Sequence, residues 1–367
     1  MNRLFCNPVE IISSRGCVRE YDGYSRFGRK CLIVCGKSSA RLCGVLDDLQ
    51  NVLTAQGVAF SVFDRTEQNP TVETCLEAGT YARETKAEFI IGVGGGSPLD
   101  ASKAAAVFAA NPHMDVKTLY DENAMLSDPL PIIAIPTTAG TGSEVTQYSV
   151  LTVHSIQNKK TLKTPKIFPK VALLDPEYTL TLSKSITAAT AVDALSHSVE
   201  GYFAKGATVI SDALAEKAML FVGRGLSSLA EGKLDVALRE KLLLGSMLAG
   251  LVISVTGTSF VHSFGYPLTY FEGIPHGEAN AYFLPDFLRY MESTSQNRVS
   301  RVLRLCGVKS TEEFENLILN AVPCDRRFSR DNVMKYARIG LNGASAKKAL
   351  FEPELSDAYD MFKKYIR

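Results

Sequence analysis

The stretch Phe89-Ile-Ile-Gly-Val-Gly-Gly-Gly-Ser-Pro-Leu-Asp100 joins an apolar, β-rich run to a sequence that suits the start of a helix. Ser97 suits the N-cap of that helix, and Pro98 suits its first position. Consecutive glycines let the backbone approach a ligand closely, and the N–H groups at a helix N-terminus attract anions. The stretch therefore predicts a strand, a glycine turn and a helix, and the turn is either a plain tight connection or a pyrophosphate site.

Segments on both sides of this stretch alternate between strand-like and helix-like patterns. Apolar runs predict strands at residues 31–35, 59–63, 89–93 and 131–135. Amphipathic patterns predict helices at residues 38–55, 72–84 and 98–110. The strand runs are continuously apolar, as expected when both faces of a sheet are covered. Strands separated by helices of this length indicate a parallel α/β sheet with crossover connections.

After Asp175-Pro176 the 3.6-residue periodicity of helices dominates, and no convincing strand pattern appears. Helical patterns occupy residues 186–204, 209–228, 236–255, 285–291 and 299–306. We therefore expect an α/β domain over residues 1–180 and an all-helical domain over residues 181–367. Residues 242–271 contain no Asp, Glu, Lys or Arg, but Gly, Ser, Thr and His interrupt them, so a buried helix pair is favoured over a membrane span.

Composition limits the classes of partner. In 367 residues, Lys+Arg number 40 and Asp+Glu 39, a formal charge of +1 that argues against a nucleic-acid binder. Eight cysteines include no CxxC pair, and Cys31 and Cys35 share one face of a predicted strand as small buried hydrophobes. Asn7, Pro8 and Glu10 interrupt any apolar core of a signal peptide. We expect a protein of the reducing cytoplasm with no membrane segment.

A second glycine-rich loop, Pro136-Thr-Thr-Ala-Gly-Thr-Gly-Ser-Glu144, follows the predicted strand at residues 131–135. Its hydroxyl donors stand at the carboxyl end of a strand, where open α/β sheets bind ligands. The alternative is an ordinary Thr- and Gly-rich surface loop. Two such loops at the ends of sheet strands favour one extended cofactor that carries phosphates. The hydroxyl donors are Thr137, Thr138, Thr141 and Ser143.

The turn after the first strand, Gly36-Lys-Ser-Ser-Ala-Arg41, offers a third contact to such a cofactor. An acidic residue at a turn of this kind would bind the 2′-hydroxyl of a ribose. None is present. The residues that suit a 2′-phosphate instead are Lys37, Ser38, Ser39 and Arg41. The turn therefore favours NADP(H) over NAD(H).

Three of the five histidines lie within residues 197–276 of the helical half. Asp193 and His197 have the i, i+4 spacing that places both on one helix face, which is either a ligand pair or an ordinary polar face. His262 and His276 lie in apolar, uncharged surroundings, where an unpaired imidazole would be costly to bury. One carboxylate and three imidazoles suit a divalent cation, and Fe²⁺ and Zn²⁺ both accept such ligands. The other histidines, in polar loops and expected at the surface, are His113 and His154.

Four segments together resemble the iron-containing (group III) alcohol dehydrogenase family. They are residues 94–100, 136–144, 191–200 and His262 with Pro275-His-Gly-Glu-Ala-Asn280, and the likeness extends from about residue 25 to about residue 295. The resemblance implies an N-terminal parallel-sheet nucleotide-binding domain and a C-terminal helical metal-binding domain, a dehydroquinate synthase-like architecture. It also implies hydride transfer between NAD(P)(H) and a small primary alcohol or aldehyde whose oxygen binds Fe²⁺, in a homodimer or larger homo-oligomer.

The resemblance implies roles for individual residues. The metal ligands would be Asp193, His197, His262 and His276. Lys159 matches a nucleotide-contacting lysine of the family, although the neighbouring Lys160 is an alternative. With the residues already named from the patterns, the cofactor contacts would be Gly36, Lys37, Ser38, Gly95, Gly96, Ser97, Asp100, Thr137, Thr138, Thr141, Ser143 and Lys159.

One position departs from the family. Many members carry a second histidine four residues after the ligand equivalent to His262, and this chain has Tyr266 there. Tyr266 either orients substrate and relays a proton or has only a packing role, in which case water and the ribose hydroxyls would carry the proton.

Other activities fit parts of the pattern. A glycerol-dehydrogenase-like zinc enzyme and a dehydroquinate-synthase-like lyase share the expected architecture, and a non-catalytic metal- and nucleotide-binding protein is a further alternative. The apolar neighbourhood of His262 disfavours a dianionic substrate such as the lyase requires; it consists of Phe260, Phe264, Tyr266 and Leu268.

Overall fold

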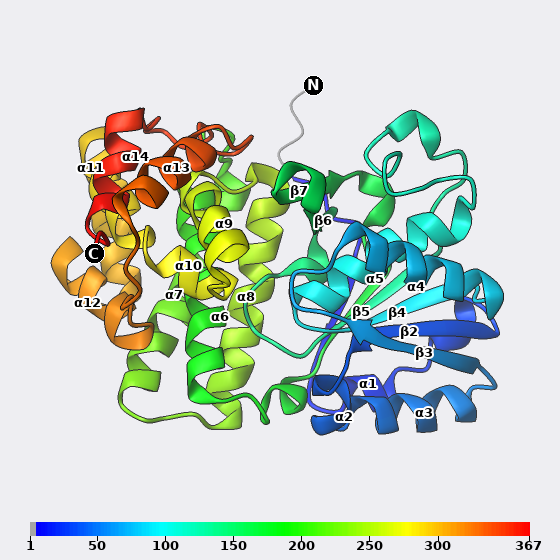
Figure 1. Ribbon diagram of the computed structural model, residues 1–367. Helices are drawn as coiled ribbons and strands as arrows, with labels where there is room; N and C mark the ends of the chain where they lie inside the picture. The colour runs from blue at the N-terminus through cyan, green and yellow to red at the C-terminus, as the bar shows by residue number, and fades with distance from the viewer. Residues whose placement is uncertain (1–4) are drawn as a thin grey trace. The chain divides into compact units, whose positions relative to one another are not determined.

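The computed structural model describes residues 5–367, so the first four residues of the stretch considered for a signal peptide lie outside it. The chain forms two compact units (Figure 1). The first, called here the α/β unit, contains residues 7–138 and 142–182. The second, the helical unit, contains residues 183–367 together with residues 5–6 and 139–141.

The α/β unit contains a six-stranded sheet in which every pairing is parallel, with strand order β1-β8-β5-β4-β2-β3. The four predicted strands are confirmed as β2, β3, β4 and β5. Two further strands, β1 and β8, escaped prediction because four residues are too few to show a pattern. The strands are β1 Glu10–Ser13, β2 Lys30–Gly36, β3 Ala59–Thr66, β4 Phe89–Gly94, β5 Ile132–Pro136 and β8 Val171–Leu174.

Helices cover both faces of this sheet. Figure 1 shows α1, α2 and α3 on one face and α4 and α5 on the other. Along β2, Cys31, Ile33 and Cys35 pack into the core that contains α3, while Leu32 and Val34 pack into the core that contains α4 and α5. Burial on both faces explains the continuously apolar strands. The helices are α1 Cys17–Glu20, α2 Ser39–Leu42, α3 Val45–Ala55, α4 Val72–Glu84 and α5 Gly96–Ala110.

Two predicted helix boundaries are wrong. Residues 38–55 do not form one helix, because Gly44, at a φ of 83° that glycine adopts readily, separates α2 from α3. Ser97 is not an N-cap, because α5 begins at Gly96 and Gly95 occupies that position. The hydroxyl of Ser97 accepts instead from the backbone N–H of Asn69, at 3.1 Å. The glycines themselves therefore form the turn into α5.

An antiparallel hairpin of β6 Tyr148–Val153 and β7 Asn158–Lys163 was not predicted. Three lysines in β7 give that strand a polar sequence with no apolar run. A parallel bridge from Thr152 to Thr71 attaches the hairpin at the start of α4. Short 3₁₀ turns complete the unit at Tyr24–Arg26, Glu122–Ala124, Ser143–Val145, His154–Ile156, Pro165–Ile167 and Pro176–Thr179.

The sheet topology brings the three loops considered for a cofactor to one edge. β4 lies between β2 and β5, with Cys35 opposite Val93 and Gly94 opposite Pro136. The strand order reverses between β2 and β4, which is where open α/β sheets bind ligands. The loops after β2, β4 and β5 therefore emerge side by side at the carboxyl end of the sheet.

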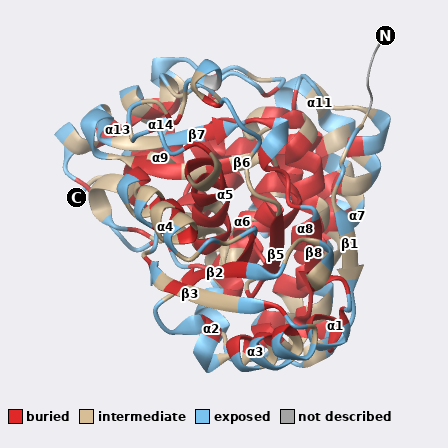
Figure 2. Ribbon diagram, turned by 90° about the vertical axis from the view of Figure 1, so that its right-hand side faces the viewer, coloured by how far each residue is buried: buried red, intermediate tan, exposed pale blue. Residues whose placement is uncertain are grey.

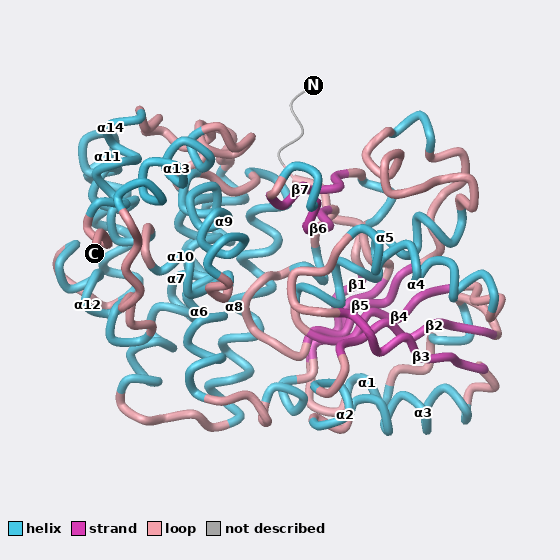
Figure 3. Tube along the Cα trace, in the orientation of Figure 1, coloured by secondary structure: helices cyan, strands magenta, loops and turns pink. Residues whose placement is uncertain are grey.

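The helical unit has the all-helical character expected of the second half of the chain. Among its described residues there is no strand, only isolated bridges (Figure 3). α6 packs against α7, α8 and α10 and is buried over most of its length (Figure 2). The helices are α6 Lys184–Tyr202, α7 Val209–Ala230, α8 Val236–Thr256, α9 Phe260–Glu272, α10 His276–Ala281, α11 Leu284–Cys306, α12 Thr311–Ala321, α13 Arg330–Leu341 and α14 Leu355–Lys363.

The uncharged stretch 242–271 is a buried helix pair, as predicted. α8 and α9 meet at an angle of 108° around Gly257. Within residues 5–367, no single helix is long and apolar enough to cross a membrane, and only this bent pair reaches the required length and composition together. The two patterns predicted at 285–291 and 299–306 are the halves of α11, which bends at Ser295.

Candidate metal and cofactor sites

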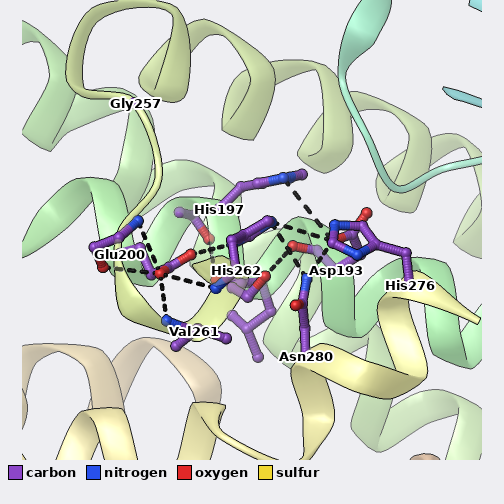
Figure 4. Close-up of polar contacts among 12 residues, drawn as sticks. Asp193, His197, Glu200, Gly257, Val261, His262, His276 and Asn280 are labelled. Carbon is purple, nitrogen blue, oxygen red and sulfur yellow. Dashed lines mark hydrogen bonds and ion pairs between the residues drawn. The ribbon is translucent and has the colours of Figure 1, made fainter. Parts of the chain in front are cut away.

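Three imidazoles in the helical unit face one carboxylate (Figure 4). Asp193 and His197 lie one turn apart on α6, His262 lies in the first turn of α9, and His276 begins α10. The Nε2 atoms of His262, His276 and His197 lie 3.5, 3.8 and 3.9 Å from Oδ1 of Asp193. The structure therefore brings together the four residues that the sequence singles out.

These spacings suit ligands around one ion. Two ligands that each lie about 2.1 Å from a tetrahedral ion are about 3.4 Å apart. The most compact set is Asp193, His262 and His276, whose ligand atoms all lie within 4.8 Å of one another. His197 adjoins this set, and its ring stacks on that of His262 with centroids 4.5 Å apart. With one carboxylate, imidazoles and no thiol, the donors fit Fe²⁺ or Zn²⁺.

The protonation states of Asp193 and His197 favour cation binding. Burial alone would raise the pKa of Asp193, but His197, His276 and His262 outweigh burial and hold that pKa well below its ordinary value. Burial lowers the pKa of His197 to about 4, against the opposing effect of Asp193. Asp193 is therefore anionic and His197 neutral near pH 7, which are the forms that bind metals. Burial would lower the pKa of His262, but Glu200 and Asp193 raise it to about 9, so a bound cation must displace a proton there.

Glu200 hydrogen-bonds to the ring of His262 on the side away from Asp193, and the sequence analysis did not assign it a role. Its Oε1 accepts from Ser259 N–H at 2.9 Å, Ser259 Oγ at 2.8 Å and Val261 N–H at 2.9 Å. Its Oε2 accepts from Nδ1 of His262, so that Nε2 faces Asp193 (Figure 4). Burial opposes ionisation of Glu200, but His262 outweighs burial and lowers the pKa of this carboxyl. A carboxylate behind a ligating imidazole fixes its tautomer and orientation.

Asn280 is a second polar partner that sequence reasoning missed. The side chain is fully buried, and its Nδ2 donates to Asp193 Oδ1 at 2.9 Å and lies 3.3 Å from Nε2 of His262. A Cβ at Gly265 would stand 2.5 Å from Oδ1 of Asn280, so glycine provides the room for this amide. Two features of the sequence could have pointed to these partners. Glu200 shares the helix face of Asp193 and His197, and Asn280 ends the motif that begins at Pro275.

Close approach of α10 to α6 places His276. A Cβ at Gly277 would lie 2.1 Å from the carbonyl oxygen of Ala189 and 3.3 Å from Cβ of Asp193. Contacts below 3 Å with backbone cannot be accommodated without a shift of one helix. Only glycine at residue 277 therefore allows His276 to reach Asp193.

Tyr266 lies beside the site. Its ring stacks on that of His276, with centroids 5.5 Å apart and an interplanar angle of 23°. His276 is the most exposed of the four candidate ligands, with 24% of its side chain accessible. The position fits both a packing role and a catalytic role, so the catalytic role of Tyr266 stays a prediction.

Three of the four apolar residues expected around the substrate are core residues instead, so they do not support the inference about substrate charge. Phe260, Phe264 and Leu268 are all completely buried. Phe260 packs on Phe287, and Phe264 packs on aromatic rings of the same core. These side chains stabilise the helical unit and carry no information about the substrate.

In the α/β unit, two of the predicted cofactor loops contact each other. Thr137 N–H donates to the carbonyl oxygen of Gly94 at 2.9 Å. A Cβ at Gly95 would stand 3.1 Å from Oγ1 of Thr138, so the glycine allows the loops to pack closely. No described side chain caps the N-terminus of the 15-residue helix α5, which begins at Gly96. Its N–H groups remain available for an anion.

The remaining predicted contacts fall into three groups. Asp100 and Ser143 bond to each other, with Ser143 Oγ donating to Asp100 Oδ1 at 2.6 Å. Thr141 belongs to the helical unit by its contacts. At the turn after Gly36, Lys37 and Ser38 are exposed. The structure thus describes where these side chains lie, and their roles toward a cofactor stay predictions.

Lys159 and Lys160 differ in surroundings. The ammonium of Lys159 donates to Oδ1 of Asn69 at 2.7 Å, and Asn69 in turn donates its N–H to Ser97 beside the glycine loop. Lys160 instead lies over the ring of Tyr120, at 4.1 Å from its centroid. The link through Asn69 favours Lys159 as the lysine near the predicted nucleotide. His113 and His154 are exposed, as predicted.

Comparison with known proteins decides the family. The family model for iron-containing alcohol dehydrogenases matches residues 8–176. A second family model, for the C-terminal domain of Fe-containing alcohol dehydrogenases, matches residues 187–323. The chain belongs to the iron-containing alcohol dehydrogenase family. Among family relatives, lactaldehyde reductase of Escherichia coli K12 is 35% identical over 328 residues, covering 88% of this chain and 85% of its own length.

Solved structures agree with the family assignment. The iron-containing alcohol dehydrogenase of Thermotoga maritima has a TM-score of 0.91 and 34% identity, with 99% of each chain covered. Sulfoacetaldehyde reductase of Bifidobacterium kashiwanohense, solved in complex with NAD⁺, has a TM-score of 0.87 and 29% identity, covering 100% of this chain and 99% of its own. The expected architecture, a parallel-sheet domain followed by a helical domain, is confirmed.

Proposed function

We propose that the protein is a metal-dependent oxidoreductase that transfers a hydride between NAD(P)(H) and a small primary alcohol or aldehyde. The observation that carries this proposal is the convergence of His197, His262 and His276 on the carboxylate of Asp193. The family membership supports the alcohol or aldehyde as substrate class.

The proposed cation is Fe²⁺, with Zn²⁺ as the alternative. When bound, it acts as a Lewis acid that stabilises negative charge on a substrate oxygen. Asp193 supplies the anionic ligand, and the imidazoles supply neutral ones. Glu200 keeps Nε2 of His262 directed at Asp193, and Asn280 holds the carboxylate through a neutral donor. Tyr266, stacked on His276, is the proposed group for orienting substrate and relaying a proton.

The α/β unit is proposed to bind the dinucleotide. The N-terminus of α5 and the Thr137–Thr138 loop would hold the pyrophosphate, and the turn at Gly36 would lie near the adenosine ribose. NAD⁺ in the solved sulfoacetaldehyde reductase supports a nicotinamide cofactor. In this chain Lys37 is an exposed cation at the turn, whereas Arg41 pairs with Asp64 at 3.4 Å. On the strength of Lys37 and of glycine at residue 36, we propose a preference for NADP(H).

Compartment and assembly are part of the proposal. Every cysteine from Cys6 to Cys324 is a free thiol, which suits a reducing compartment, and we propose the cytoplasm. A homodimer or larger homo-oligomer stays a prediction that sedimentation of the purified protein would test.

The test combines metal analysis with an activity panel. Protein purified without oxygen is stripped of metal, reloaded with Fe²⁺ or Zn²⁺, and given short aldehydes such as butyraldehyde with NADPH or NADH. We expect loss of absorbance at 340 nm only in reloaded samples, fastest with Fe²⁺ and with a higher kcat/KM for NADPH. Turnover that survives complete metal removal would overturn the metal-dependent scheme. Cofactor binding without turnover of any alcohol or aldehyde would favour the non-catalytic alternative, and zinc-dependent oxidation of glycerol the glycerol-dehydrogenase-like one.

A further inference from the structure

One ring nitrogen of the candidate metal ligand His197 is buried without a hydrogen-bond partner. Nε2 of this imidazole lies 3.9 Å from Oδ1 of Asp193. Nδ1, on the other side of the ring, has no acceptor in hydrogen-bond geometry among residues 5–367. A neutral imidazole that binds a cation through Nε2 carries its proton on Nδ1, and a buried N–H without an acceptor costs free energy. His197 therefore needs an acceptor at Nδ1.

His262 already has such an acceptor in this protein. Its Nδ1 donates to Oε2 of Glu200, which directs Nε2 at Asp193. Carboxylates and backbone carbonyl oxygens both serve as acceptors behind ligating imidazoles. Glu200 is occupied by His262 and by the first turn of α9, so the ring of His197 must use another group.

A backbone group from the Thr- and Gly-rich loop acts on His197. Burial, the largest effect, lowers the pKa of His197 to about 4, and the backbone of Gly140 is among the groups that oppose this shift. A backbone group that raises the pKa of an imidazole acts as an acceptor, through its carbonyl oxygen. Because Nε2 is directed at Asp193, Nδ1 is the nitrogen left for this oxygen. The carbonyl oxygen of Gly140 therefore lies close to Nδ1 without meeting full hydrogen-bond geometry.

Close packing on α6 holds Gly140 in this place. A Cβ at residue 140 would stand 2.8 Å from Cβ and 3.0 Å from the carbonyl oxygen of Thr190. Gly140 does not adopt a positive φ, so space and not backbone conformation makes glycine necessary here. Thr190, Asp193 and His197 follow the i, i+3, i+7 spacing of one helix face. The loop therefore packs on the face of α6 that carries two candidate ligands.

The loop is anchored on both sides of Gly140. Before it, Thr137 N–H donates to the carbonyl oxygen of Gly94 at 2.9 Å. After it, the side chain of Ser143 bonds to α5. Residues 139–141, between these anchors, belong by their contacts to the helical unit. A short segment that is tethered at both ends and packed in the middle can hold one carbonyl oxygen in a constant position.

We propose that Gly140 is a positioning residue for the candidate metal ligand His197. Its carbonyl oxygen accepts from Nδ1–H of His197, selects the tautomer with an unprotonated Nε2 and directs that nitrogen at the cation site. Gly140 thus acts on His197 as Glu200 acts on His262, and it touches neither the cation nor the substrate. This inference rests on the proposed function, since it assumes a cation at the four candidate ligands.

The first experiment measures binding of Zn²⁺ to the metal-stripped full chain by competition with a chromophoric chelator. The variant is Gly140→Ala, whose Cβ forces the loop away from Thr190 and withdraws the carbonyl oxygen from His197. The matched control is Gly206→Ala in the same unit, since a Cβ there meets no atom within 4 Å. We expect Kd to rise about 10- to 100-fold for Gly140→Ala, as with other losses of an outer partner, and to stay unchanged for Gly206→Ala.

Nuclear magnetic resonance of ¹⁵N-labelled histidines separates positioning from general disturbance of the site. At saturating Zn²⁺, Nδ1–H of His197 should exchange slowly with water, as should that of His262, which serves as the internal reference. His197→Gln and His262→Gln assign the two signals. In Gly140→Ala the signal of His197 should be lost to exchange while that of His262 persists. Loss of both signals together, or an unchanged Kd or a protected His197 signal in a folded Gly140→Ala, would overturn the proposal.

The unaltered protein keeps the test decisive if Gly140→Ala does not fold. His197 should carry its proton on Nδ1 with and without Zn²⁺, which the ¹⁵N shifts of its two ring nitrogens report. A proton on Nε2, or an Nδ1–H that exchanges as fast as in free histidine, would contradict the proposal. Failure of the unaltered protein to bind Zn²⁺ or Fe²⁺ would instead contradict the proposed function, so the two failures are distinguishable.

Discussion

Glu200 orients a candidate metal ligand without belonging to the predicted ligand set. It accepts hydrogen bonds from the first turn of α9 and from Nδ1 of His262, so one carboxylate fixes both the start of the helix and the rotation of the imidazole. Because both contacts come from one buried group, substitutions at Glu200 and at His262 should both weaken metal binding, the substitution at Glu200 by less.

We predict that His262→Ala abolishes metal loading while the fold persists, and that Glu200→Gln lowers metal affinity about 10- to 100-fold, as other losses of an outer partner do. Metal content by mass spectrometry and far-UV circular dichroism measure the two quantities. Glu216→Gln is the matched control, since Glu216 lies in the same unit but bonds to Arg301 and Tyr202 and to none of the candidate ligands. Normal metal loading in His262→Ala would contradict the proposed ligand set.

Tyr266 tests whether the departure from the family pattern is functional. If its hydroxyl relays a proton, Tyr266→Phe should lower kcat about 100-fold, within the range for general acid–base catalysis, and remove one limb of the pH profile of kcat. Tyr266→His should restore part of the rate. A kcat in Tyr266→Phe equal to that of the unaltered protein, together with a loss in Tyr266→Leu, would assign the ring to packing on His276 alone.

Glu144 makes stability depend on pH. Burial raises its pKa from 4.5 to about 7, with its own backbone N–H and Lys103 opposing. Between pH 4.5 and 7 the folded protein therefore binds more protons than the unfolded chain, and the free energy of unfolding falls as pH rises. We predict that Glu144→Gln is more stable than the unaltered protein above pH 7 by about 2–3 kcal/mol, with no advantage below pH 4.5. Urea unfolding at pH 5 and pH 8 checks this, with the exposed Glu84→Gln as control; an equal effect at both pH values would contradict it.

Sequence spacing predicted the residues with the clearest local signal. Asp193 and His197 follow from the i, i+4 rule, and His262 and His276 from imidazoles in apolar surroundings. Glu200 and Asn280 could not be assigned in the same way, because their roles depend on where α9 and α10 meet α6. The role of Gly140 was missed because Thr190, its contact on α6, lies 50 residues further along the chain.

At the scale of elements, prediction succeeded where a segment is long and buried on a regular pattern. α4 and the four predicted strands lie within about three residues of their predicted positions. Prediction failed where a single residue or a partner distant in the sequence determines whether an element forms. Gly44 interrupts an otherwise continuous amphipathic pattern, and β1 exists because β8 pairs with it, which no local sequence reveals.

The packing of α10 on α6 yields a prediction for an element. In Gly277→Ala the new Cβ would overlap the carbonyl oxygen of Ala189, so α10 must move away and carry His276 with it. We expect metal affinity to fall at least about tenfold while α6 and α9 stay folded. Gly206→Ala is the control, because a Cβ there meets no atom within 4 Å. Retained affinity in Gly277→Ala would show that His276 does not depend on this contact.

At the scale of the whole molecule, the two units divide the proposed binding tasks. The candidate metal ligands Asp193, His197, His262 and His276 belong to the helical unit, and the predicted cofactor contacts other than Thr141 belong to the α/β unit. The change from continuously apolar runs to 3.6-residue patterns predicted an α/β part followed by a helical part. Spacing and composition alone could not predict that residues 139–141, inside the second loop, belong by their contacts to the helical unit.

This division predicts separate footprints for the two ligands. A ligand that binds only the folded state stabilises it, and at 100 times Kd the gain is about 2.7 kcal/mol. In hydrogen–deuterium exchange, Fe²⁺ or Zn²⁺ should slow exchange in peptides of α6, α9 and α10, whereas NADPH should slow exchange in peptides covering residues 89–104 and 131–150. In His262→Ala the metal footprint should vanish while the NADPH footprint on the α/β unit persists. Metal protection confined to the α/β unit, or an NADPH footprint that avoids the start of α5, would contradict the assignment of the two sites to the two units.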